Sequence, residues 1–268
     1  MTLVKGKDTH RKYSTAISKG AGMIEETRRL LGHWRPDEPL DDFARRVQEQ
    51  GLLGNATAYR TRDLVRRVFA PRLLRPSDKP ARMLQRVIAS GLPGRVFTEL
   101  LFVFAARRDP LVYDFTVHEY WPAVRSGSPV LDPNAMLSFL SEAHYDGRLD
   151  KQWSEKVSMR VARSVLAILR DVGFLRALCR GRREIVDYRM SDEGAVILAR
   201  ELNEAGVTDS SLCDHPDWGL FGMTPSEVVE RLDGIGEHRG VIVQRAGSVV
   251  HFTWVVGSIE ELIDVLTR

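Results

Sequence analysis

Basic residues spaced along positions 154–172 are the clearest candidates for chemistry, and that chemistry is the binding of a polyanion. At about 100° per residue, the apolar residues of this segment share one helical face: Val157, Val161, Val165, Ile168 and Val172. The basic residues gather on the other side, with Arg160 at the edge: Lys156, Arg160, Arg163 and Arg170. A planar guanidinium donates two parallel hydrogen bonds, which suits phosphate groups and guanine edges. The segment therefore predicts a helix whose basic front lies along a nucleic-acid groove; the alternative is an ordinary solvated helix face.

Arginine and lysine are also concentrated between residues 60 and 86, where nine basic residues face only Asp63 and Asp78, a net charge of +7 over 27 residues. Six arginines of this span are candidate phosphate contacts: Arg60, Arg62, Arg66, Arg67, Arg82 and Arg86. Because acidic partners within the span are few, we predict phosphate contacts here, which give salt-sensitive and sequence-independent affinity. The alternatives are an acidic protein partner or the acidic C-terminal part of the same chain.

A third basic feature is a predicted turn. Two segments that alternate apolar and polar residues, 174–180 and 184–190, lie on either side of Gly181, Arg182 and Arg183. This pattern predicts a β-hairpin with a basic turn. In a winged helix, such a hairpin contacts the DNA backbone. We therefore add Arg182 and Arg183, beside Arg180, to the candidate DNA-binding residues.

Signals for catalysis, metals and cofactors are weak. The sequence has no GxxxxGK[ST] loop, and the glycines at 20–22 follow no predicted strand. None of the seven histidines pairs with another at i, i+4, and Cys179 and Cys213 are too isolated for a metal framework. Adjacent Glu25 and Glu26 point about 100° apart, which is typical of a salt-bridged surface. We therefore predict no catalytic residue, no metal, no cofactor and no enzyme activity.

The sequence patterns around these residues predict a mainly α protein. Helices are expected over Thr15–Leu31, from Leu40, over 57–70 with Pro71 as the terminator, from Pro80, and over the strongly apolar Gly94–Arg108. The SGSP segment at 126–129 predicts a domain boundary. A helical domain with a basic N-terminal arm then covers residues 1–127, and a second domain covers 128–268.

The second domain has the element order of a winged helix-turn-helix unit. A short helix over 134–143, the long helix over 154–172, the hairpin and a helix over 191–203 follow one another. The chain then continues as an acidic helix–hairpin–helix segment. Its helices begin at capping boxes at Thr224–Glu227 and Ser258–Glu261, and its hairpin is predicted to turn at Ala246-Gly247.

Charge is divided unevenly along the 268 residues, although the net charge is only +3. Residues 201–268 carry 4 Arg or Lys and 12 Asp or Glu, a net of −8, so residues 1–200 carry about +11. A basic body favours a polyanionic partner, although surface charge also segregates by chance.

The most apolar run, Val96–Ala106, contains Glu99 and is shorter than the roughly 18 to 20 residues of a membrane span. With no signal-peptide pattern at the N-terminus, we expect a cytoplasmic protein without a membrane contact.

Residues 13–34 carry a resemblance to a known family. Their pattern of Tyr13, Thr15, Lys19, Gly20, Glu25-Glu26-Thr27, Leu31 and Trp34 resembles the BrxA family of bacterial BREX (bacteriophage exclusion) systems. The overall length, the helical front half and the hairpin-bearing rear half agree with it more loosely. The resemblance implies a small, mainly helical, DNA-associating accessory protein that acts beside a DNA methyltransferase and other large components in phage defence. It implies no catalytic residues. Some members are labelled as inner-membrane proteins, a label from which this chain departs.

Together these features predict a non-enzymatic protein that binds double-stranded DNA, largely through phosphate contacts, within a BREX system. The alternative is a scaffold whose arginine surface docks other components of the system. An enzyme such as a nuclease is the third class. The sequence leaves open the base preference, the choice between DNA and RNA, the oligomeric state and the protein partners.

Overall fold

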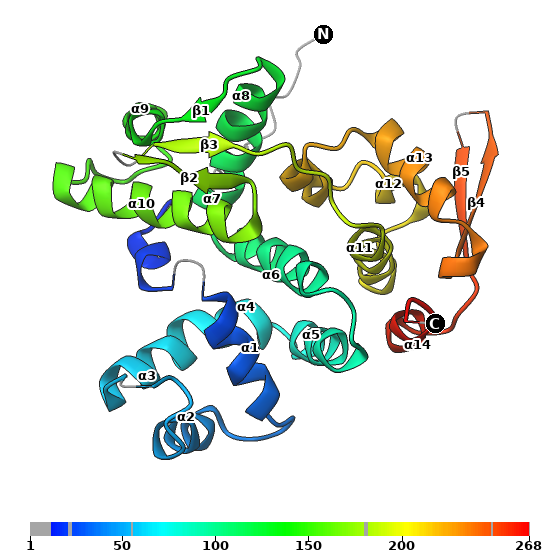
Figure 1. Ribbon diagram of the computed structural model, residues 1–268, viewed down its shortest axis with the longest axis horizontal. Helices are drawn as coiled ribbons and strands as arrows, with labels where there is room; N and C mark the ends of the chain where they lie inside the picture. The colour runs from blue at the N-terminus through cyan, green and yellow to red at the C-terminus, as the bar shows by residue number, and fades with distance from the viewer. Residues whose placement is uncertain (1–11, 21–22, 55, 180–181, 248, 268) are drawn as a thin grey trace, which may run out of the picture.

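The computed structural model of the chain describes residues 12–20, 23–54, 56–179, 182–247 and 249–267. It is mainly α, as predicted, and is arranged around helix α6 (Gly94–Arg108). In Figure 1, the helices of residues 24–90 lie below α6, those of residues 110–172 with a small sheet lie above it, and those of residues 192–265 with a second hairpin lie to its right. The predicted division of the chain at residues 127 and 128 stays a prediction.

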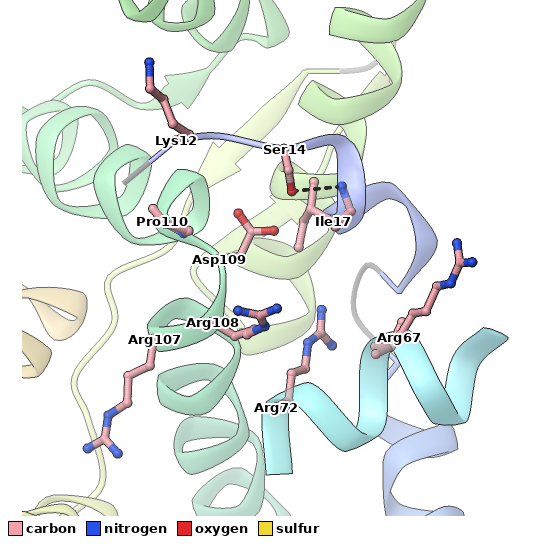
Figure 2. A pocket seen from close by; sticks show the side chains of 11 residues that line it. Lys12, Ser14, Ile17, Arg67, Arg72, Arg107, Arg108, Asp109 and Pro110 are labelled. Atoms are coloured by element: carbon pink, nitrogen blue, oxygen red, sulfur yellow. Dashed lines mark hydrogen bonds between the residues drawn. The ribbon is translucent and has the colours of Figure 1, made fainter. Parts of the chain in front are cut away.

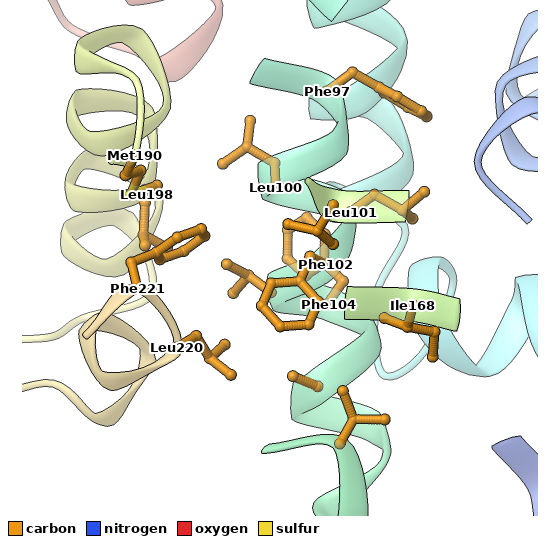
Figure 3. Close-up of a cluster of buried hydrophobic side chains, with 14 of the residues drawn as sticks. Phe97, Leu100, Leu101, Phe102, Phe104, Ile168, Met190, Leu198, Leu220 and Phe221 are labelled. Atoms are coloured by element: carbon orange, nitrogen blue, oxygen red, sulfur yellow. The ribbon is translucent and has the colours of Figure 1, made fainter. Parts of the chain in front are cut away.

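Helix α6 is buried on nearly all sides because it is apolar on nearly all sides. Its predicted bounds, Gly94 to Arg108, are confirmed, and every side chain from Val96 to Ala106 except that of Thr98 is buried. Phe102 meets Phe174 and Phe221 edge to face, with ring centres 5.4 and 6.1 Å apart. Figure 3 shows Leu220 and Phe221 on one flank of α6 and Ile168 on the other. Helix α6 therefore joins α10 and the C-terminal elements in one core.

The predicted first helix, Thr15–Leu31, is wrong as a single element. The structure has a 3-10 helix η1 (Thr15–Lys19) followed by α1 (Ile24–His33), with Met23 in the left-handed region at φ 41°. The Gly20 backbone lies so close to η2 (Val65–Phe69) that an added Cβ atom would come within 2.5 Å of a Val68 methyl group. This close approach explains the glycine of the family-like pattern.

Prolines interrupt two helices without ending them. Helix α3 (Ala58–Leu64) continues through a π-helical turn η2 (Val65–Phe69) into α4 (Ala70–Leu73), so the prediction that Pro71 ends this helix is wrong. The same device recurs where α7 (Pro110–Phe115) passes through η3 (Thr116–Tyr120) into α8 (Trp121–Arg125), which contains Pro122. Proline lacks an N–H and clashes with the carbonyl four residues earlier, and the wider π turn before it relieves both. The remaining helices of the first half are α2 (Leu40–Glu49) and α5 (Lys79–Ser90).

A three-stranded antiparallel sheet accompanies the helix pair α9 (Pro133–Tyr145) and α10 (Glu155–Val172). The predicted hairpin forms, but its strands β2 (Leu175–Ala177) and β3 (Arg183–Ile185) are shorter than the alternating segments indicate. A short strand before the helix pair, β1 (Val130–Leu131), which was not predicted, pairs with β3, so the order is β1-β3-β2. The chain thus runs strand, helix, helix, hairpin.

The C-terminal part surrounds helix α11 (Asp192–Glu204). It contains α12 (Asp209–Leu212), η5 (Pro216–Phe221), α13 (Pro225–Ile235), η6 (Glu237–Arg239), β4 (Val241–Ala246), β5 (Val249–Trp254) and α14 (Ile259–Val265). The capping box that opens α13 at Thr224 and Glu227 is present in full. Ala246 pairs with Val249, so Ala246 belongs to the strand rather than to the predicted turn. The hairpin extends away from the body at the right of Figure 1, while α14 packs on α5.

Candidate nucleic-acid interface

Helix α10 has the two faces that the periodicity predicts. Val161, Val165, Ile168 and Val172 are buried, and Val157 at the first turn is half-buried. The basic side chains on the opposite side are all exposed: Lys156, Arg160, Arg163 and Arg170. Ser154 occupies the N-cap position, although its side chain makes no capping hydrogen bond. The apolar back of α10 fixes the direction in which its basic front points, because burying a guanidinium in its place is costly.

Most of this basic front carries no countercharge. Among the described residues, Lys156, Arg160 and Arg163 have no carboxylate partner within ion-pair distance, whereas Arg170 Nη2 lies 2.6 Å from Asp171 Oδ1. Residues 156 and 163 are separated by about 10 Å at the 1.5 Å rise of a helix. Three unpaired cations therefore line about two turns of an exposed helix, an arrangement that can follow a row of phosphate groups.

The hairpin next to α10 adds a smaller basic surface. Arg182 is exposed, and Arg183 is half-buried and donates to the Arg182 carbonyl oxygen at 3.3 Å. Arg176 is already paired across the strands with Glu184, at 2.5 Å. Arg180 and Gly181 lie outside the described residues. The structure thus brings Arg182 and Arg183 to the end of the hairpin that directly follows α10.

The arginines of α3 to α5 have more acidic partners than the sequence span suggests. Arg67 lies 3.1 Å from Asp63, and Arg82 lies 2.8 Å from Asp78. The other partners come from distant segments: Arg66 pairs with Asp41 of α2, and Arg86 pairs with Asp264 of α14. The Arg66 guanidinium hydrogen-bonds the Asp41 carboxylate and holds its pKa below the usual range. Acidic residues within the span are few, as the sequence indicates, but folding brings Asp41 and Asp264 to two of its arginines from outside the span.

The two remaining candidates of this span differ from each other. Arg60 donates to the Lys19 carbonyl oxygen at 2.7 Å, so it is bound to the last residue of η1. Arg62 is exposed and, among the described residues, has no hydrogen-bond or ion-pair partner. Among the described residues, the candidate cations without an ion-pair partner therefore lie mainly on α10, at Lys156, Arg160 and Arg163. The span from residue 60 to 86 contributes less than its sequence suggests, because four of its six candidate arginines are in ion pairs.

The structure contains a further cluster of basic residues that was not predicted from the sequence. Arg108 and Asp109, at the junction of α6 and α7, line a cavity of about 560 Å³ together with Arg72 of α4. Asp109 accepts a hydrogen bond from the Leu111 N–H and caps α7, which is the only local signal that this Asp-Pro pair gives. Nothing in the local pattern indicates that Arg72 lies beside it.

Two further observations bear on other functions. No three His, Cys, Asp or Glu side chains among the described residues are grouped so that they could hold a metal ion. No helix in the described part of the chain combines the length and the apolarity that a membrane crossing requires.

A family model and a solved structure each match most of the chain. The family model described as BrxA matches residues 11–201, which include the family-like pattern at 13–34, α10 and the first hairpin. A crystal structure of an uncharacterized protein from Magnetospirillum magneticum superposes with a TM-score of 0.58 at 21% sequence identity and covers 73% of this chain and 96% of that chain. At this identity the likeness shows a shared fold alone. No curated protein matches the chain significantly.

Proposed function

This chain belongs to the BrxA family, and on that premise we propose that it is a non-enzymatic DNA-binding component of a BREX phage-defence system. Family membership by itself makes it a BREX-associated protein. The further step, binding of double-stranded DNA largely through phosphate groups, rests on the surface of α10. The single observation that carries it is the row of exposed, unpaired cations at Lys156, Arg160 and Arg163.

The arrangement around α10 supports this step. Strand β1, helices α9 and α10 and the hairpin β2–β3, with sheet order β1-β3-β2, follow one another as in a winged helix-turn-helix unit. In such units the second helix of the pair enters the major groove, and we assign this role to α10. The hairpin is then the wing, whose turn with Arg182 and Arg183 contacts the backbone.

Phosphate contacts in this arrangement give affinity with little base preference. The ion pairs of Arg66, Arg67, Arg82 and Arg86 reduce what α3 to α5 contribute, because each guanidinium must leave a carboxylate to reach DNA. Of the candidate arginines of this part, Arg62 is exposed and has no ion-pair partner among the described residues. We therefore place the main interface on α10 and its hairpin.

Fluorescence anisotropy with labelled duplex DNA at several salt concentrations tests the proposal. With roughly five phosphate contacts, log affinity falls against log salt with a slope of about −4 to −5, and unrelated duplex sequences bind alike. A salt-independent affinity contradicts phosphate binding. If the protein ignores duplex DNA but captures other BREX components such as the DNA methyltransferase, the scaffold function replaces this one. Single-stranded DNA and RNA of the same length complete the comparison.

A further inference from the structure

A cavity between the N-terminal segment and the α6–α7 junction has the composition of an anion-binding site. It measures about 560 Å³, within the range of small-molecule sites. Its walls come from residues 12–17, from η2 and α4, and from residues 107–110. Among the described residues, five basic side chains and one carboxylate line it: Lys12, Arg67, Arg72, Arg107, Arg108 and Asp109.

Only two of the five cationic groups are turned into the cavity. Figure 2 shows the guanidinium groups of Arg72 and Arg108 near its centre, with the Asp109 carboxylate close by. Lys12 points outward to the Gly147 carbonyl oxygen and Asp150, and Arg67 points outward toward Asp63. Arg107 turns to the other side of α6, where it pairs with Glu201 and Asp217. The functional groups of the cavity are therefore two guanidiniums and one carboxylate.

The surroundings of Arg72 disfavour the charged form of its guanidinium. Burial lowers the pKa of its guanidinium to about 10, so it remains charged at neutral pH. Its hydrogen bond within the described residues goes from Nη2 to the Gly20 carbonyl oxygen at 3.1 Å, and no described carboxylate lies within ion-pair distance of it. The Asp109 carboxylate acts on this half-buried charge from beyond ion-pair distance and offsets its desolvation only in part. An anion in the cavity would supply a closer countercharge.

Arg108 adds a second cation on the same side. It is exposed and, among the described residues, has no ion-pair partner. Two guanidiniums that converge on one space repel each other when it is filled by water and clamp a group with several anionic oxygens. A phosphoryl group fits this demand better than a carboxylate, since it presents three oxygens to the two forks.

Asp109 indicates what else the occupant carries. Its carboxylate is buried and accepts a backbone hydrogen bond from Leu111. A bare anion would be repelled by this carboxylate, whereas a hydroxyl group would donate to it. The apolar wall formed by Ala16, Ile17, Val68 and Pro110 provides contact area for the body of such a molecule.

We propose that the Arg72–Arg108 cavity binds a phosphorylated small molecule that bears hydroxyl groups, of the size of a nucleoside monophosphate. The phosphoryl group lies on Arg72 and Arg108, and a sugar hydroxyl donates to Asp109. This site is separate from the α10 surface and does not depend on DNA binding. It gives the protein a second, metabolite-sized ligand.

Isothermal titration calorimetry of the full chain tests the proposal with four probes: adenosine 5′-monophosphate, ribose 5-phosphate, adenosine and inorganic phosphate. We expect at least one of the two phosphorylated sugars to bind saturably, and adenosine to bind at least tenfold more weakly. If neither phosphorylated sugar binds, or if adenosine binds equally well, the proposal is overturned. Excess duplex DNA should leave the probe bound. Displacement by duplex would assign the cavity to DNA phosphate and overturn the small-molecule assignment.

Substitutions locate the binding. Arg108→Gln should weaken the phosphorylated probe by about tenfold or more, since a hydrogen bond to a charged group is lost. Arg29→Gln, an equally exposed arginine of α1 outside the cavity, should not change it. Equal effects of the two variants would overturn the site. For the half-buried Arg72 the substitution is Arg72→Lys, which keeps the positive charge and removes the planar guanidinium. Circular dichroism confirms that this variant folds.

Asp109→Asn separates the two parts of the proposed contact. Asparagine preserves the N-cap of α7 and removes the negative charge. The variant should gain more affinity for inorganic phosphate than for ribose 5-phosphate. The repulsion of the phosphate is removed, while a neutral amide oxygen accepts the hydroxyl hydrogen bond more weakly than a carboxylate does. If both probes gain affinity by the same factor, the carboxylate does not hold a hydroxyl, and that part of the proposal is wrong. Duplex affinity is expected to stay unchanged in all these variants.

Discussion

Reversing the charge of Arg160 and Arg163 together tests the DNA-binding proposal most directly. Both side chains are exposed, lie about one turn apart on α10 and have no carboxylate partner among the described residues. Arg160→Glu with Arg163→Glu therefore breaks no ion pair between described residues. Exposed substitutions of this kind change the free energy of unfolding by under about 0.5 kcal/mol, so the variant should melt like the wild type.

The expected loss of affinity follows from the contacts removed. A hydrogen bond from a cation to a phosphate contributes about 1.5 kcal/mol or more, and two of them correspond to roughly hundredfold weaker binding. The introduced glutamates repel phosphate and increase the loss. Each lost phosphate contact also makes the slope of log affinity against log salt shallower by about 0.9, so the double variant should lose about 2 from its slope.

Anisotropy titrations of the wild type and the variant at several salt concentrations measure both quantities. The matched control is Arg29→Glu with Arg45→Glu, which makes the same change in net charge on exposed positions of α1 and α2. If the control weakens DNA binding as much as the α10 variant, net charge rather than the α10 surface determines affinity, and the placement on α10 is refuted. If instead Arg62→Glu has the larger effect, the interface lies on α3.

Four further predictions follow from buried groups, ion pairs and the absent catalytic motifs. Val161→Asp places a carboxylate at a fully buried position of α10 and should lower the free energy of unfolding by about 4 kcal/mol or more. An unchanged melting curve would mean that this face of α10 is not buried. Addition of Mg²⁺, Mn²⁺ or ATP to the purified protein with duplex DNA should give no cleavage, methyl transfer or hydrolysis. A turnover that one substitution abolishes would contradict the proposal that the protein is not an enzyme. Burial raises the pKa of Asp109 from 3.8 to about 6, so the folded chain takes up a proton between about pH 6 and pH 4 that the unfolded chain does not. The ionised group thus costs on the order of 3 kcal/mol above pH 6, and the free energy of unfolding of the wild type, measured against Asp109→Asn by urea titration, should rise as the pH falls to 4; a constant difference contradicts this. The Arg86–Asp264 pair has side chains that are 42% and 43% exposed, so a double-mutant cycle should give a coupling below about 1 kcal/mol, whereas Leu262→Ala in the buried face of α14 should cost about 2 to 5 kcal/mol. A coupling above 2 kcal/mol would show that the ion pair, rather than apolar packing, holds α14 on α5.

Features that depend on neighbours within a few positions were predictable from the sequence. The valines of α10 are buried and its basic residues exposed, because a helix repeats its faces every 3.6 residues whatever lies around it. The bounds of α6 and the capping box at Thr224 follow from the same kind of local pattern. The first hairpin was recognised from alternation, but its third strand, β1, was too short to give a pattern of its own.

Local rules failed where a distant segment decides the outcome. Pro71 was expected to end a helix, yet the apolar residues around it, among them Phe69 and Leu73, are buried, and the π turn lets the helix continue past the proline. Gly20 looked like part of a helix, yet its close contact with Val68 bends the chain away from one. In both places packing against other elements outweighs the local preference.

By itself, the sequence determined that this protein is mainly helical, that α10 presents a basic face, and that residues 13–34 resemble one family. Only the tertiary structure decided which cations remain free. Arg66 finds its carboxylate 25 positions away and Arg86 finds its own 178 positions away, while Arg72 and Arg108 converge on a cavity that no local pattern marks. The physical reason is range. Helix faces follow from rotation along one segment, whereas ion pairs and cavities form only when segments that are far apart in the chain are packed together.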